Sequence, residues 1–162
     1  MKNNGKVVGL NKLKNITRGL RQKKKTIAFT NGCFDILHYG HVKYLEKAQK
    51  KNRVLIVAVN SDASVRAIKG PKRPIVSEKE RAHVLAALAC VDYVTIFNEE
   101  TPYNIIKALQ PDSLIKGADW RRKKVVGEDI VKAQGGRVEF IKYLKQFSTT
   151  KMIRSIALKC AK

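Results

Sequence analysis

Residues 26–41 read TIAFTNGCFDILHYGH, and this stretch decides the fold. Residues 26–30 are typical of a buried strand, and Gly32 permits a tight backbone turn just beyond it. His38 and His41 stand three residues apart, where a helix can begin. A strand, a turn and a helix start in this order predict a ligand site at the carboxyl end of a parallel strand.

Outward from this stretch, short β-type runs alternate with helical patterns. Residues 54–59 are apolar on both faces, as in a central strand of a parallel sheet. The alternation predicts an α/β protein with a Rossmann-like three-layer α/β/α fold and a five-stranded parallel sheet. The expected strands are residues 26–30, 54–59, 93–97, 113–115 and 137–141, and the expected helices are residues 10–23, 39–51, 77–88, 101–109 and 127–134, with a last one after Ser148.

Several helix starts carry capping signals. Ser77 and Glu80 form a capping-box pattern, Thr101 and Pro102 read as a cap followed by a first-turn proline, and Ser148 is expected to cap the last helix. Since ligands of parallel sheets bind beyond the carboxyl ends of the strands, function is expected in the loops after Thr30, Asn60, Lys116 and Tyr143.

The charge of the chain is strongly basic and unevenly distributed. Thirty-four Lys and Arg stand against 13 Asp and Glu, a formal net charge of +21, which favours anionic partners. Residues 1–34 and 140–162 contain no acid, so the ends carry most of the excess. Solvated surface is the simplest interpretation, and a nucleic-acid arm is the alternative. With aromatic residues at only 7%, a nucleic-acid partner is not favoured.

Length and composition limit how many domains the chain can form and where it can be located. Its 162 residues suffice for one domain, so we expect a basic N-terminal segment with a helix at residues 1–25 and the main domain at residues 26–162. The longest apolar stretch, residues 54–59, is far short of the roughly 18 residues of a membrane span. An odd number of cysteines at no metal-like spacing fits reduced thiols and a cytoplasmic location.

The two histidines have a physical rationale of their own. At the first turn of a helix, a spacing of three puts both imidazoles on one side, near the positive end of the helix dipole. Gly40 between them leaves room for a ligand to approach the backbone. Together these groups predict a phosphate site. A zinc site that uses Cys33 with both histidines lacks a fourth ligand at metal spacing.

The amino-acid sequence around these residues resembles that of a known family. His38-Tyr39-Gly40-His41 matches the HxGH signature of the nucleotidyltransferase superfamily, which includes cytidylyltransferases and class I aminoacyl-tRNA synthetases. Over roughly residues 10–158 the chain closely resembles the bacterial D-glycero-β-D-manno-heptose 1-phosphate adenylyltransferases, or ADP-heptose synthases. The segments that carry this resemblance are residues 29–41, 55–64, 69–74, 91–94, 116–120 and 148–150.

The resemblance implies an activity. AMP would pass from ATP to D-glycero-β-D-manno-heptose 1-phosphate, giving ADP-heptose and pyrophosphate for lipopolysaccharide or surface-glycan precursors. A cytidylyltransferase acting on a small phosphorylated alcohol such as glycerol 3-phosphate is the alternative. In many bacteria the adenylyltransferase is the C-terminal half of a bifunctional protein with a sugar kinase, and the absence of a kinase half here implies the stand-alone form.

The resemblance also implies site residues. His38 and His41 would be catalytic, stabilising the α- and β-phosphates. The implied nucleotide-binding residues are Thr30, Asn31, Gly32, Cys33, Phe34, Asp35, Gly40, Lys116, Gly117, Asp119, Trp120, Ser148, Thr149 and Thr150. The implied sugar-phosphate-binding residues are Asn60, Asp62, Lys69 and Arg81.

Some of these roles have alternatives. Asp35 would orient a phosphate-binding partner, help hold Mg²⁺, or simply bond at the helix entry. Trp120 would stack on a base or cover the cleft, and Arg81 would bind substrate or form a salt bridge on its helix. Mg²⁺ is the expected cofactor, carried mainly by the ATP phosphates, because no metal-ligand motif is present. The expected partners are ATP and a sugar 1-phosphate, with no membrane partner; whether the chain is a homo-oligomer stays open.

Overall fold

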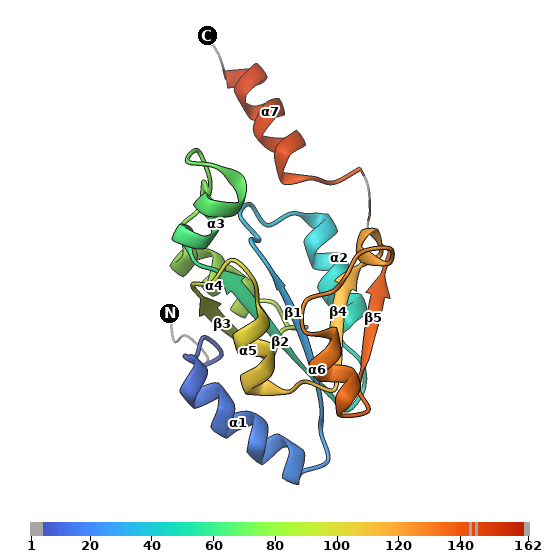
Figure 1. Ribbon diagram of the computed structural model, residues 1–162. Coiled ribbons are helices and arrows are strands. Elements are labelled where there is room, and N and C mark those ends of the chain that lie inside the picture. The colour runs from blue at the N-terminus through green and yellow to red at the C-terminus, as the bar shows by residue number, and fades with distance from the viewer. Residues whose placement is uncertain (1–4, 143, 145, 161–162) are drawn as a thin grey trace.

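The computed structural model describes residues 5–142, 144 and 146–160, and its centre is a five-stranded sheet in which every pair of neighbouring strands is parallel (Figure 1). The strand order is β3-β2-β1-β4-β5. β2 fills the middle of the core, because residues 55–59 have no exposed surface. The strands are β1 (Thr26–Gly32), β2 (Arg53–Asn60), β3 (Tyr93–Phe97), β4 (Ser113–Gly117) and β5 (Arg137–Ile141).

Helices cover both faces of the sheet. One core cluster joins the sheet to α2 and α4, and a second joins it to α1, α5 and α6. The predicted three-layer Rossmann-like fold with five parallel strands is therefore confirmed. The helices are α1 (Leu10–Gln22), α2 (Tyr39–Ala48), α3 (Asp62–Lys69), α4 (Glu78–Ala86), α5 (Tyr103–Leu109), the 3₁₀ turn η1 (Ala118–Trp120), α6 (Glu128–Ala133) and α7 (Thr149–Cys160). In the described part of the chain we find no helix whose length and apolar content would let it span a membrane.

The capping signals are mostly confirmed. Ser77 and Glu80 form the reciprocal capping box at the start of α4. The expectation for α5 is wrong by one residue, because Pro102 is its N-cap and the Pro102 carbonyl accepts the Ile106 N–H (3.0 Å). α3 was not among the predicted helices, although Ser61 caps it by accepting the Ser64 N–H (3.2 Å).

The N-terminal segment packs on the same core as the sheet. Val8 and Leu13 are buried in the cluster that contains α5 and α6. The segment also pairs with β3, since the Val8 N–H donates to the Val94 carbonyl (2.9 Å) and the Val94 N–H to the Lys6 carbonyl (2.8 Å). The apolar face of α1 therefore covers its own chain's sheet.

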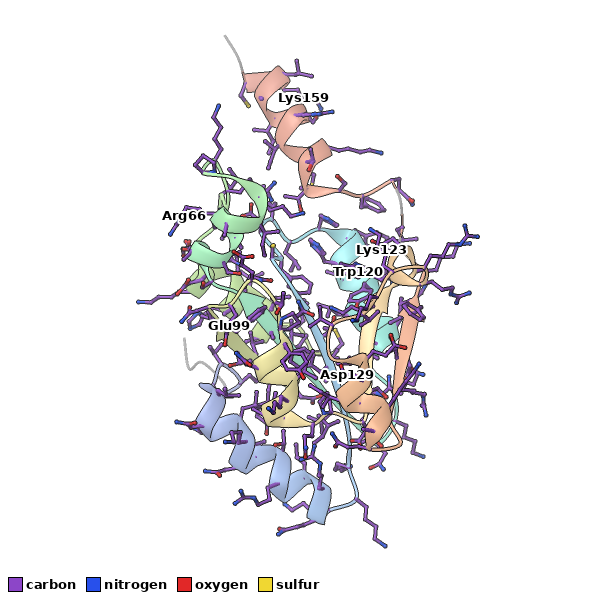
Figure 2. The ribbon with its side chains drawn as sticks, viewed as in Figure 1. Arg66, Glu99, Trp120, Lys123, Asp129 and Lys159 are labelled. Atoms are coloured by element: carbon purple, nitrogen blue, oxygen red, sulfur yellow. The ribbon has the colours of Figure 1, made fainter. Side chains whose placement is uncertain are left out.

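The last helix differs from the others. α7 projects beyond the body of the molecule (Figure 1), and none of its side chains is buried. Many basic side chains lie in solvent around the fold, such as Arg66, Lys123 and Lys159 on separate parts of the surface (Figure 2). This distribution fits a solvated surface rather than a single basic patch.

Candidate active site

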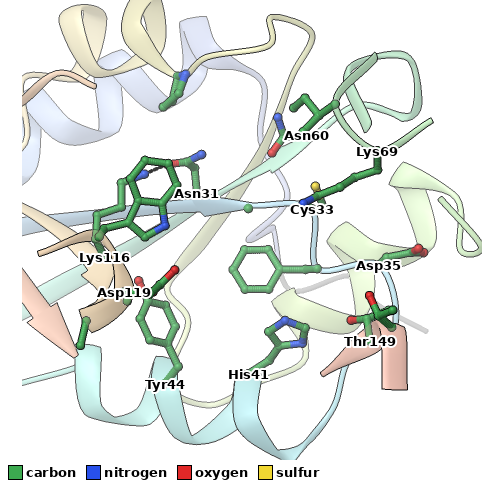
Figure 3. Close-up of a pocket in the computed structure, with 18 of the residues that line it drawn as sticks. Asn31, Cys33, Asp35, His41, Tyr44, Asn60, Lys69, Lys116, Asp119 and Thr149 are labelled. Carbon is green, nitrogen blue, oxygen red and sulfur yellow. Dashed lines mark hydrogen bonds between the residues drawn. The ribbon is translucent and has the colours of Figure 1, made fainter. Parts of the chain in front are cut away.

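A cavity of about 1380 Å³ opens where the strands end. Its lining includes Gly32 at the end of β1, Asn60 at the end of β2 and Gly117 at the end of β4. A cavity therefore lies where the sequence places the site, beyond the carboxyl ends of the parallel strands (Figure 3). The loop expected after Tyr143 begins at a residue outside the described part of the chain.

The structure brings most of the sequence-predicted residues to this cavity. The lining includes Asn31, Gly32, Cys33, Phe34, Asp35, His41, Asn60, Lys69, Lys116, Gly117, Asp119, Trp120, Thr149 and Thr150. It does not include Thr30, His38, Gly40, Asp62, Arg81 or Ser148. These six do not line the cavity, although His38 lies next to it, stacked on His41.

The two histidines stack on each other at the start of α2. Their ring centroids are 3.8 Å apart with an interplanar angle of 16°, which confirms that the spacing places both imidazoles on one side. His38 is the N-cap of α2, and its Nδ1 accepts the His41 N–H (3.3 Å). Because that Nδ1 accepts, a neutral His38 carries its proton on Nε2. Gly40 gives this ring room, since a Cβ would stand 3.1 Å from the His38 ring and 3.0 Å from the Phe147 Cβ.

Both imidazoles are neutral near pH 7. Burial, helped by the neighbouring His38, lowers the pKa of His41 to about 4. Burial also lowers the pKa of His38. Within the described residues, the His41 Nδ1 atom is buried without a hydrogen-bond partner. Such an atom costs roughly 1–3 kcal/mol, and the few that persist in native proteins often belong to functional sites.

The turn before the histidines is held in an unusual backbone conformation. Phe34 has a φ of 46°, which is costly for a bulky side chain. Its ring lies against Gly32, where a Cβ would come within 3.1 Å, and meets the His41 ring edge-on at 5.2 Å. Gly32 thus makes room for the ring that supports His41.

Asp35 binds the segment that follows α3. Its Oδ1 accepts the N–H groups of Ile75 (2.8 Å) and Val76 (2.9 Å), and its Oδ2 pairs with Arg73 Nε (2.5 Å). Of the roles considered for Asp35, the geometry supports the orientation of a cationic partner, because its oxygens are already engaged. Arg73 lines the cavity and stands in the segment 69–74 that carries the resemblance, but it was not among the predicted site residues.

Arg81 has the salt-bridged role rather than a place on the cavity wall. It is fully buried, and its Nη2 pairs with Asp62 (2.6 Å). Arg81 also donates to the carbonyls of Cys33 (2.5 Å) and Val76 (2.9 Å). In this structure Arg81 and Asp62 do not line the cavity, and the bonds of Arg81 join the start of α3 to the segments that carry Cys33 and Val76.

The loop after β4 forms the opposite side of the cavity. Lys116 Nζ donates to Asn31 Oδ1 (2.6 Å) and lies 5.3 Å from the centroid of the Trp120 ring (Figure 3). Burial lowers the pKa of Lys116 to about 8, against the opposing influence of Asp119. Lys123 approaches the same ring (5.4 Å), so Trp120 lies in a cationic environment suited to phosphates and a base.

Some of the remaining predicted residues line the cavity, and others hold the residues that line it. Thr30 lies behind the wall and shares a hydrogen bond with the Tyr44 hydroxyl (2.9 Å). Ser148 acts as a cap, accepting the Lys151 N–H (3.3 Å), while Thr149 and Thr150 line the cavity. Burial raises the pKa of the Cys33 thiol, which therefore stays protonated at neutral pH.

Other residues of the cavity wall had no sequence signal strong enough to identify them. They come from α2, α3 and the segment after it, η1, and the loops after β3, η1 and β5. Arg73 and Ala118 stand in segments that carry the resemblance, and the others have no signal beyond their place in the chain. The whole set is Tyr44, Ile68, Arg73, Glu100, Thr101, Pro102, Ala118, Val126, Lys142, Leu144 and Gln146.

The residues present suit a metal that arrives with the nucleotide. Among the described residues no group of three His, Cys, Asp or Glu side chains stands close enough to hold a metal ion. The carboxylates of the cavity wall are those of Asp35, Glu100 and Asp119, and within the described part of the chain only Asp35 has its oxygens hydrogen-bonded by the protein. Asp119 is the carboxylate of this wall that lies near Lys116.

A doubly wound parallel sheet with stacked histidines and cations around a cavity at its switch point defines a nucleotide-binding α/β enzyme. Residues 29–155 match the family model described as cytidylyltransferase-like. The chain belongs to this cytidylyltransferase-like family of nucleotidyltransferases.

Comparison with known proteins adds detail. The bifunctional protein HldE of Syntrophotalea carbinolica is 52% identical over 144 residues, 89% of this chain and 29% of that protein. HldE of Campylobacter jejuni subsp. doylei is 56% identical over 137 residues, 85% of this chain and 29% of that protein. The chain thus spans less than a third of the length of these relatives. The crystal structure of a lipopolysaccharide core biosynthesis protein from Thermoplasma volcanium has a TM-score of 0.59 and 27% identity, covering 73% of this chain and 98% of that one.

Proposed function

We propose that the protein transfers AMP from ATP to D-glycero-β-D-manno-heptose 1-phosphate, releasing pyrophosphate and ADP-heptose for lipopolysaccharide or surface-glycan synthesis. The observation that carries the proposal is that cations stand on both sides of the histidine pair. Lys116 lies on the β4 side, and Lys69 and Arg73 lie on the other. A reaction between a nucleoside triphosphate and a phosphorylated acceptor needs this arrangement, because phosphates enter from both directions.

The reaction requires the protein to position the two substrates and to stabilise the negative charge that develops on the phosphates. The acceptor's phosphate oxygen is already anionic, so it attacks the α-phosphorus without a protein base. A new P–O bond forms there, the bond to the β-phosphate oxygen breaks, and pyrophosphate carries the electron pair away. His38 and His41 donate hydrogen bonds to the phosphates as this charge develops. An anion beside His41 favours the imidazolium, so binding raises its pKa from about 4.

The remaining phosphate contacts follow from the wall of the cavity. Lys116, Thr149 and Thr150 would bind the phosphates of ATP, while Trp120 would cover or stack on the base. Mg²⁺ would be held mainly by the ATP phosphates, with Asp119 as its protein ligand, and would neutralise their charge.

The choice of ATP and a heptose rests on similarity. Relatives named HldE match at about 50% identity across most of this chain, and the structural relative is named for lipopolysaccharide core biosynthesis. These names support ADP-heptose synthesis over the alternative with CTP and glycerol 3-phosphate. We also propose that residues 26–162 carry the chemistry and that the enzyme acts in the cytoplasm. A homo-oligomer stays a prediction, which light scattering tests.

A pyrophosphate-release assay tests the activity. ATP and CTP are each combined with heptose 1-phosphate and with glycerol 3-phosphate, and only ATP with heptose 1-phosphate is expected to give rapid release. Release only from CTP with glycerol 3-phosphate would overturn the proposal.

The histidine role has its own test. His41→Ala should lower kcat by about 10²–10³-fold, the usual cost of one charge-stabilising donor, with an unchanged circular dichroism spectrum. His83→Ala, on the exposed face of α4, is the control and should turn over like the wild type. Wild-type turnover in His41→Ala would remove His41 from the mechanism.

A further inference from the structure

The central strand divides the cavity into two halves. The strand order runs from β1 through β2 to β3 on one side and through β4 to β5 on the other. Lys116 stands in β4 and Asp119 follows that strand, whereas Asn60 and Lys69 belong to the β2 side, with His41 between the two groups (Figure 3). The halves therefore differ in the side chains that they offer.

The half over β2 and β3 presents open hydrogen-bonding groups. Asn60 Nδ2 donates to Ser64 Oγ (2.9 Å), and Ser64 Oγ donates to the Glu99 carbonyl (2.9 Å). These bonds fix the loop after β3 against β2. They leave Asn60 Oδ1 without a partner among the described residues. Glu100 and Thr101 follow on the same loop, are solvent-exposed and line the cavity.

Two cations stand in the same half. Lys69 ends α3, and Arg73 lies in the segment held by Asp35. Arg73 uses Nε for Asp35, and its terminal nitrogens have no partner within the described part of the chain. A phosphate bound by these two side chains would place the rest of the acceptor toward Asn60 and the loop after β3.

Resting on the proposed function, we propose that Glu100 is a specificity residue that binds the hydroxyls of the acceptor sugar. An ionised carboxylate accepts two O–H groups at once, and the Asn60 carbonyl and Thr101 hydroxyl extend this recognition. Apolar Ile68 and Pro102 in the same wall suit the C–H face of a sugar. The pocket thus selects a phosphorylated polyol.

A phosphorylated amino alcohol is the rival acceptor for such a carboxylate. The described lining over β2 and β3 offers no aromatic ring for a cationic head, which such ligands favour. Lys69 and Arg73 in the same half repel an ammonium group. The neutral oxygens of Asn60 and Thr101 complement hydroxyls instead.

The test compares Glu100→Gln with Glu99→Gln. Glu99 is the adjacent exposed carboxylate, and its side chain is not part of the cavity wall. The substitution keeps the Glu99 backbone carbonyl, which accepts the hydrogen bond from Ser64 Oγ. Turnover gives the KM of heptose 1-phosphate and of ATP, and calorimetry gives the affinity for heptose 1-phosphate without nucleotide. Glu100→Gln should weaken the acceptor about ten- to a hundredfold, as expected for loss of a charge-assisted hydrogen bond, and leave the KM of ATP unchanged. Glu99→Gln should match the wild type.

The outcomes separate the two proposals. An unchanged acceptor KM in Glu100→Gln, or an equal rise in the KM of ATP, overturns the role of Glu100 while leaving ADP-heptose synthesis intact. A wild type that rejects heptose 1-phosphate in both measurements overturns the proposed function. A wild type that uses a phosphorylated amino alcohol, with this use lost in Glu100→Gln, overturns the polyol pocket.

Discussion

The buried, neutral imidazole of His41 makes the stability of the fold depend on pH. Its pKa is about 4 in the folded protein, against 6.5 for an ordinary histidine. Between these values the unfolded chain binds more protons, so the free energy of unfolding falls as the pH falls from about 6.5 towards 4. The lowered pKa of His38 acts in the same direction.

The magnitude follows from the shift. The full difference from 6.5 to about 4 corresponds to about 3 kcal/mol, and about 2 kcal/mol of it is already lost at about pH 5. Because the His41 side chain is buried, solvent screening reduces this figure little. His41→Gln keeps a polar side chain but removes the titration.

Urea unfolding at about pH 5 and about pH 7.5 measures the effect. The wild type should lose about 2 kcal/mol more between these conditions than His41→Gln does. His83→Gln, outside the cavity, should lose as much as the wild type. Equal losses in the wild type and His41→Gln would refute the reasoning, since they would mean that His41 titrates alike in both states.

Three further outcomes follow from the cavity. Because the pKa of Lys116 is about 8, Lys116 loses its charge at higher pH, and the KM of ATP should therefore increase when the pH exceeds about 8. Lys116→Met should have a raised KM of ATP at every pH, without this increase. A wild-type KM that does not change with pH would contradict the prediction. Asp35→Asn breaks the buried pair with Arg73, so the free energy of unfolding, measured in urea, should fall by about 3–5 kcal/mol. The KM of the acceptor should rise in the same variant. An unchanged free energy of unfolding and an unchanged KM would contradict this prediction. Gly40→Ala puts a Cβ 3.1 Å from the His38 ring, so kcat should fall about tenfold with little change in Tm; full activity would mean that the ring position is unimportant.

The fold was predictable because its signals are local. Residues 54–59 are apolar throughout and become the buried centre of β2, and the capping box at Ser77 marks the start of α4. The spacing of His38 and His41 fixes their stacking, since three residues at a helix start leave few other arrangements.

What could not be predicted depends on contacts between distant segments. Arg73 reaches Asp35 across 38 residues, and no local pattern indicates that pair. Arg81 resembles an ordinary charged helix residue, and only the packed loops around it bury it beside Asp62. Glu100 has no signal except its place after β3.

The pairing of residues 6–8 with Val94 changes what one edge of the sheet exposes. β3 is an outermost strand, and the unpaired N–H and C=O groups of such a strand are a template for another chain. Residues 6–8 occupy part of that template, and the Lys6 ammonium donates to the Leu88 and Val91 carbonyls beside it. Part of the basic N-terminal segment, for which phosphate transfer has no evident use, thus covers a sheet edge that would otherwise be open to another strand.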